Sequence, residues 1–180
     1  MRYFFSFFIV LFVIVGSTFL LIKKDPHYFY ADINGTKVGL ESFDGEYKAV
    51  YFGYLYCPDI CPSTLFKLSE VLKELNRSDF KLVFITIDPE RDTNEELTQM
   101  AQNFYDNAIG LKINNLKYVA KNYGVKYQKI EMPDSAMRYS VAHSSSIYLL
   151  DKKGKFFTEI SNLTTKNIRE NLQNLIKQRP

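Results

Sequence analysis

A pair of cysteines at the junction of a strand-like run and a helix-like run constrains the fold more than any other feature. Residues 49–54 are apolar and rich in aromatic side chains, which is typical of a buried strand. After Pro62, leucines recur at helical spacing and predict a helix over residues 62–75. Cys57 and Cys61, the only cysteines of the chain, therefore lie at or just before a helix start.

The rest of the chain continues this alternation of strands and helices. Asn34-Gly35 predicts a tight turn between strands at 30–33 and 36–40. Beyond the cysteines, the pattern predicts strands at 81–87, 145–150 and 155–160, and helices at 93–104, 116–123 and around 168–176. Such an order predicts one α/β domain of thioredoxin-like type, with a central mixed β-sheet flanked by helices.

The N-terminal residues have a different composition from this domain. Residues 3–22 contain no charged side chain, and a helix of that length spans about 30 Å, enough for a bilayer core. Apolar residues follow Gly16-Ser17-Thr18, so these small residues do not form a convincing cleavage site. We expect one uncleaved transmembrane helix within residues 1–24, followed by the folded domain at 25–180.

The charge of the chain belongs to this N-terminal segment. The formal net charge is +3, and Arg2, Lys23 and Lys24 account for all of it, because residues 1–24 contain no acidic side chain. The domain from Asp25 onward is therefore neutral. A neutral domain gives no reason to expect a nucleic-acid partner.

The position of the two cysteines predicts reactive sulfur. Free backbone N–H groups and the helix dipole at a helix start favour a thiolate, which is both a nucleophile and a soft metal ligand. The three residues between Cys57 and Cys61 leave room for both sulfurs to face one point, which favours chelation. A structural disulfide is the alternative, although a bridge that closes so short a loop would stabilise the fold little.

Three sequence blocks resemble the Sco/SenC family of membrane-anchored, copper-binding assembly factors with a thioredoxin-like fold. They are YFGYLYCPDICP at residues 51–62, IDPERD at 87–92, and YSVAHS at 139–144 followed by IYLLD at 147–151. The blocks occur in the family's order, and the resemblance extends from about residue 29 to the end of the chain. A lone pair of cysteines would be far less specific than the three blocks together.

The resemblance implies that Cys57, Cys61 and His143 bind one copper ion. Two thiolates suit Cu(I), and an imidazole also makes the site acceptable to Cu(II). It further implies a metallochaperone, rather than an enzyme, for the copper centre of a respiratory haem-copper oxidase. The expected partners are the copper-binding subunit of that oxidase, a copper donor protein and a thiol reductase. The expected location is the bacterial inner (cytoplasmic) membrane, with the domain on its periplasmic or extracytoplasmic side.

Two other functions use the same cysteines. An extracytoplasmic thiol-disulfide reductase would attack other proteins' disulfides through Cys57 and Cys61, but such enzymes usually have CxxC spacing and a proline where His143-Ser144 stands here. A thiol peroxidase should have a threonine three residues before its reactive cysteine, and this chain has Tyr54 there and no tryptophan. Both features favour metal binding.

Several further residues are candidates near the site. Ala142 stands where the resemblance leads us to expect an aspartate that could orient the histidine or tune the metal. Asp88, Arg91 and Asp92 could shape the rim of the site or dock a partner, or could simply form a strand end and helix cap. Residues that we interpret as a flexible loop or a linker are Met132, Met137 and His27.

Overall fold

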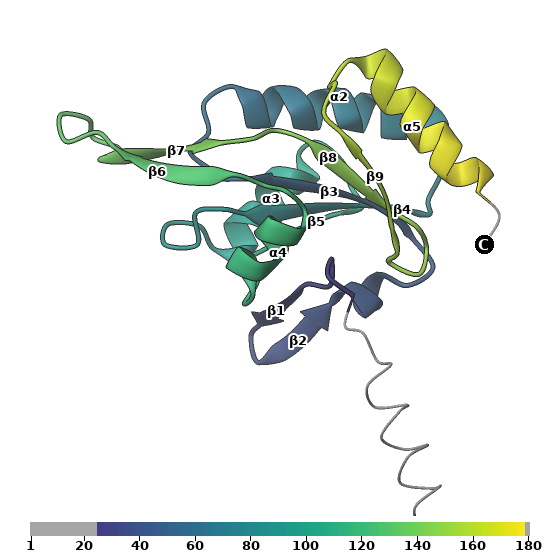
Figure 1. The fold of residues 1–180 in the computed structure, drawn as a ribbon, viewed down its shortest axis with the longest axis horizontal. Helices are drawn as coiled ribbons and strands as arrows, with labels where there is room; N and C mark the ends of the chain where they lie inside the picture. The colour runs from purple at the N-terminus through teal and green to yellow at the C-terminus, as the bar shows by residue number, and fades with distance from the viewer. Residues whose placement is uncertain (1–24, 179–180) are drawn as a thin grey trace, which may run out of the picture.

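The computed structural model describes residues 25–178, and a five-stranded mixed sheet forms their centre (Figure 1). The strand order is β5-β4-β3-β8-β9, with β3, β4 and β5 parallel and with β8 antiparallel to both of its neighbours. All seven residues of the central strand β3 are buried, which agrees with the apolar run at residues 49–53. The strands of this sheet are β3 (Tyr47–Gly53), β4 (Phe80–Thr86), β5 (Ala108–Leu111), β8 (Ile147–Leu150) and β9 (Phe156–Ile160).

Helices cover both faces of the sheet. In Figure 1, α2 (Ile60–Leu75) and α5 (Thr165–Lys177) lie on one face, while α3 (Asn94–Gln102) and α4 (Leu116–Asn122) lie on the other. The Thr93 hydroxyl accepts a hydrogen bond from the Glu96 amide at the start of α3, as the capping pattern predicts. The predicted α/β, thioredoxin-like arrangement of a mixed sheet flanked by helices is therefore confirmed.

Two hairpins lie outside the central sheet. The first, β1 (Tyr30–Ile33) with β2 (Thr36–Gly39), turns at Asn34 and Gly35, which both have positive φ as the sequence predicts. A short 3-10 helix, η1 (Leu40–Phe43), follows β2. The second hairpin, β6 (Tyr127–Glu131) with β7 (Tyr139–His143), extends away from the body of the domain in Figure 1.

The β6–β7 hairpin corrects one prediction from the sequence. Met132 and Met137 lie in the turn between the two strands, as expected for a loop. The strands themselves were not predicted: His143 is the last residue of β7, and β8 begins only at Ile147 rather than at 145. The reason is that four of the five β6 residues are exposed, so this strand lacks the apolar alternation that identifies a half-buried strand.

The expected transmembrane helix lies in residues 1–24, outside the described residues. Among residues 25–178, no helix has the length and apolar character needed to cross a bilayer.

Candidate metal centre

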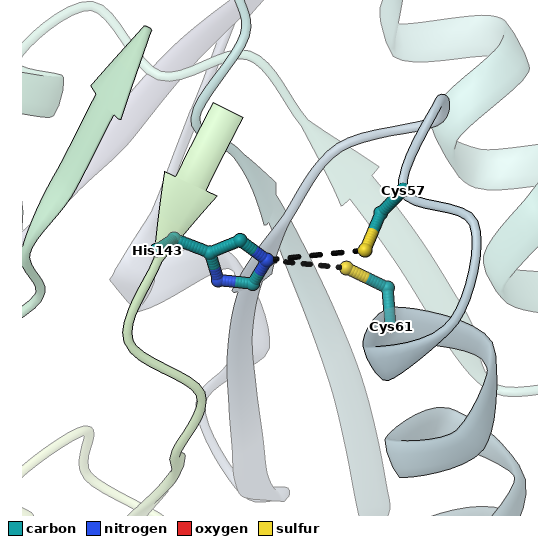
Figure 2. Close-up of side chains that lie close together, drawn as sticks. All are labelled: Cys57, Cys61 and His143. Carbon is teal, nitrogen blue, oxygen red and sulfur yellow. Dashed lines mark hydrogen bonds between the residues drawn. The ribbon is translucent and has the colours of Figure 1, made fainter. Parts of the chain in front are cut away.

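Three side chains from three different segments meet at one edge of the domain (Figure 2). Cys57 lies in the loop after β3, Cys61 lies in the first turn of α2, and His143 ends β7. The Nε2 atom of His143 is 3.6 Å from Sγ of Cys61 and 4.0 Å from Sγ of Cys57. The three donor atoms all lie within 4.8 Å of one another, so a single ion could contact all of them.

The imidazole of His143 is oriented as a metal ligand requires. Its Nδ1 atom lies 3.0 Å from the backbone carbonyl oxygen of Ser144, which can accept the Nδ1 proton. That hydrogen bond fixes the tautomer in which the Nε2 lone pair faces the two sulfurs. Burial lowers the pKa of His143 below its ordinary value, which favours the neutral ring that binds metals.

Both sulfurs are more deeply buried than the sequence indicates. Cys57 and Cys61 are free thiols with 7% and 2% exposure, respectively. Burial, followed by a hydrogen bond in which the Cys61 thiol donates to Cys57, raises the pKa of Cys61 to about 12. The expectation that the helix start would favour a thiolate is therefore wrong for the metal-free Cys61 thiol, because desolvation outweighs the helix terminus.

Gly53 explains how the Cys61 sulfur can lie so deep. A Cβ atom on Gly53 would be 2.7 Å from Sγ of Cys61 and 2.9 Å from two ring atoms of Phe84, closer than real contacts allow. The last residue of β3 must therefore lack a side chain. The Tyr-Phe-Gly-Tyr run contains this signal, but sequence reasoning alone assigned Gly53 no role.

Tyr54 is a second residue of the site that sequence reasoning did not assign to it. Its ring packs edge-on against the His143 ring, with centroids 6.0 Å apart. Its hydroxyl accepts a hydrogen bond from the Val141 amide at 3.4 Å. Tyr54 thus joins the segment before Cys57 to the strand that ends at His143.

The acidic residues after β4 make structural contacts. Asp92 is buried, and its Oδ2 atom accepts hydrogen bonds from the Thr86 hydroxyl at 2.5 Å and from the Leu55 amide at 3.3 Å. Asp88 is also buried and pairs with Arg91 at 2.6 Å. Through Asp92, the segment before Cys57 is hydrogen-bonded to the end of β4. Neither carboxylate is part of the Cys-Cys-His cluster.

Other candidates lie apart from the cluster. Met132 and Met137 are exposed at the ends of the β6–β7 turn. Ala142 is exposed opposite Gln128, and because side chains alternate along β7 it faces the side away from His143. The interpretation of His27 as a plain linker is wrong, since its ring stacks on Phe156 at 4.3 Å.

A protein-family model described as SCO1/SenC matches residues 22–177, almost the whole described region. The chain belongs to the SCO1/SenC family. An SCO2-like protein of Rickettsia typhi is 36% identical over 158 residues, covering 85% of this chain and 78% of that protein.

Solved structures of Sco proteins have the same fold. Arabidopsis thaliana ScoI with copper bound is 32% identical, with a TM-score of 0.73 and coverage of 84% of this chain and 96% of that one. Yeast Sco1 with copper bound is 27% identical, with a TM-score of 0.71 and coverage of 85% and 88%. Two sulfurs and one imidazole are also the donor set that copper favours, so the residues of this Sco chain fit such an ion.

Proposed function

We propose that this Sco protein binds one copper ion through Cys57, Cys61 and His143 and acts as a metallochaperone in cytochrome c oxidase assembly. The observation that carries the proposal is the convergence of two thiols and a correctly oriented imidazole within 4.8 Å. The copper-bound relatives of the same fold support it. Binding and handover by ligand exchange, without a catalysed reaction, would constitute its activity.

The donor set suits both oxidation states of copper. Two thiolates provide the soft ligands that Cu(I) prefers, and the His143 imidazole adds the borderline donor that Cu(II) needs. Metal binding must displace the thiol protons, so copper affinity should rise with pH.

The second candidate is a thiol-disulfide reductase that uses the same cysteines. The separation of the two sulfurs allows this reading, because both thiols are free and close together. Two observations favour copper: the attacking thiol of a reductase should be exposed and acidic, whereas Cys61 is 2% exposed with a raised pKa. In addition, Nε2 of His143 lies within 4.0 Å of both sulfurs and completes a three-donor ligand set.

The proposal extends to the place of action and the partners, for which the family membership is the support. The apolar run at residues 3–22 would anchor the chain in the bacterial inner membrane, with the domain on the periplasmic or extracytoplasmic side. The copper-binding subunit of a haem-copper oxidase would receive the metal, and a copper donor protein would supply it. A thiol reductase would keep Cys57 and Cys61 reduced, because only the reduced pair can bind the ion.

Metal analysis of the full chain tests this function. The protein would be purified in a mild detergent, fully reduced, loaded with Cu(I) or Cu(II), and freed of excess metal. We expect one copper per chain, with thiolate charge-transfer absorption in the Cu(II) form. Cys57→Ser and Cys61→Ser should each lose most Cu(I) affinity, since one thiolate with an imidazole is a poor soft site. Copper-free protein after full reduction and loading would rule the metallochaperone out.

A further inference from the structure

The guanidinium of Arg91 connects the loop after β4 to the start of β7. Its Nε atom donates to Oδ2 of Asp88 at 2.6 Å. Its Nη1 atom donates to the backbone carbonyl oxygens of Met137 and Tyr139, both at 3.2 Å. The hydroxyl of Tyr139 also donates to Oδ1 of Asp88 at 2.8 Å. One partly buried ion pair therefore fixes the residues that begin the strand ending in His143.

The same guanidinium also contacts the cysteine loop through an aromatic ring. Its central carbon lies 3.7 Å from the ring centroid of Tyr139 and 4.9 Å from that of Tyr56, which are cation–π distances. Tyr56 immediately precedes Cys57, and half of its surface is exposed (51%). Arg91 therefore contacts a partly exposed aromatic ring next to Cys57.

A second contact joins the same two segments. The Val141 amide of β7 donates to the Tyr54 hydroxyl, three residues before Cys57. The cysteine loop thus meets β7 twice, once through Tyr54 and once through Tyr56 and Arg91. These are also the two segments that carry Cys57 and His143, so any loosening of the contacts would change the distance between those donors.

We propose that Arg91 is a positioning residue, which holds the cysteine loop against β7 and thereby fixes Cys57 relative to His143 before metal arrives. The significance of this role for copper rests on the proposed function, but the role itself exists in the metal-free protein. A solely structural Arg91 would stabilise the β6–β7 hairpin without affecting how often the cysteine loop opens.

The test measures alkylation of Cys57 by iodoacetamide in the reduced, metal-free full chain, with each cysteine quantified by peptide mass spectrometry. Because Cys57 is buried, its alkylation requires the loop to open. Tyr56→Leu removes the ring that contacts Arg91, and an exposed cation–π contact corresponds to about a two- to fivefold change in an equilibrium. We expect Cys57 alkylation to accelerate by that factor. Tyr118→Leu is the matched control, since Tyr118 is equally exposed (49%) and lies in α4, and its rate should equal that of wild type.

A double-mutant cycle separates positioning from simple shielding of the sulfur by Tyr56. Arg91→Gln should accelerate alkylation by at least that factor, because Arg91 also contacts Asp88 and β7. Adding Tyr56→Leu to Arg91→Gln should change the rate little, because the contact between Tyr56 and Arg91 is already lost. The proposal would be overturned if the double variant showed the product of the two single-variant rate increases, or if Arg91→Gln left the alkylation rate unchanged. If Arg91→Gln fails to fold because Asp88 is left unpaired, Arg91→Lys replaces it, since lysine keeps a charge beside Asp88 but lacks the planar group that reaches both rings.

Copper titration of the same variants keeps this inference distinct from the proposed function. Tyr56→Leu should weaken Cu(II) binding by about the same two- to fivefold and Cu(I) binding less, because His143 contributes mainly to the Cu(II) site. A wild-type chain that bound no copper would refute the metallochaperone function while leaving the alkylation result intact. A wild-type chain that bound copper, with equal alkylation rates in all variants, would refute the role of Arg91 alone.

Discussion

Gly53→Ala should damage the fold and the metal centre together. The new Cβ would lie 2.7 Å from Sγ of Cys61 and 2.9 Å from two ring atoms of Phe84, whereas ordinary contacts begin near 3.4 Å. Both neighbours are fully or almost fully buried, so neither can move aside easily. Overpacking typically costs about 1–3 kcal/mol, and two rigid neighbours favour the upper half of that range. Alanine also lowers the conformational entropy of the unfolded chain relative to glycine, which offsets about 0.4–1 kcal/mol of this loss of stability. The free energy of unfolding should therefore fall by about 2 kcal/mol.

Two measurements on one preparation test this prediction. Urea unfolding of the reduced, metal-free protein reports the loss of stability, and competition with a chromophoric chelator reports Cu(I) affinity. Displacement of the Cys61 sulfur should weaken Cu(I) binding by about tenfold. Gly124→Ala is the control: Gly124 has φ of +72° and no atom within 4 Å of its added Cβ, so it should lose about 1 kcal/mol of stability through backbone strain and keep wild-type Cu(I) affinity. Stability of Gly53→Ala within about 0.5 kcal/mol of wild type, with unchanged Cu(I) affinity, would refute the packing argument.

Three further substitutions give sharp outcomes. His143→Ala should weaken Cu(II) binding strongly and largely spare Cu(I), and unchanged Cu(II) affinity in a titration would contradict its assignment as a ligand. Ala142→Asp should leave both affinities within about twofold of wild type, since its side chain faces away from His143, whereas the tenfold gain typical of an orienting carboxylate would contradict that geometry. Asp79→Asn should cost about 1 kcal/mol at pH 7, because Arg77 and then Lys152 lower the pKa of this carboxyl from 3.8 to about 2. The stability from Asp79 is present above pH 4 and lost as the pH falls toward 2, so acid unfolding curves of Asp79→Asn should be flatter in that window.

The parts of the fold predicted correctly are those with strong local signals. The buried run at 49–54 and the leucines after Pro62 predict β3 and α2, and Asn34-Gly35 predicts the first hairpin. The pair Cys57 and Cys61 is visible in the same way, because its position depends only on adjacent elements. His143 was identified through the resemblance of its motif, since no local pattern indicates that residues 82 positions apart will meet.

The features that the sequence did not reveal depend on tertiary packing. Solvent exposure of β6 removes the apolar alternation that would have identified it, so the β6–β7 hairpin went unpredicted. The raised pKa of Cys61 depends on how deeply α2 packs against β3, which the helix-start argument does not take into account. The expected importance of Ala142 rested on the family resemblance, which leads us to expect an aspartate beside the histidine, but neighbours along a strand face opposite sides.

Cys61 lies in the core, whereas His143 lies at the end of an exposed hairpin. This difference explains why substitutions of the cysteines and of the histidine should affect copper binding differently. Cys61 is buried in the core beside Gly53, so a change at the sulfurs alters the site for either oxidation state of copper. His143 ends a strand of the exposed hairpin and is held by the Ser144 carbonyl and the Tyr54 ring. Loss of the imidazole therefore leaves the thiol pair in place. The comparison to make is the loss of Cu(I) and Cu(II) affinity in the cysteine variants and in His143→Ala. Equal losses in all variants would contradict this division between a sulfur pair in the core and an imidazole on the hairpin.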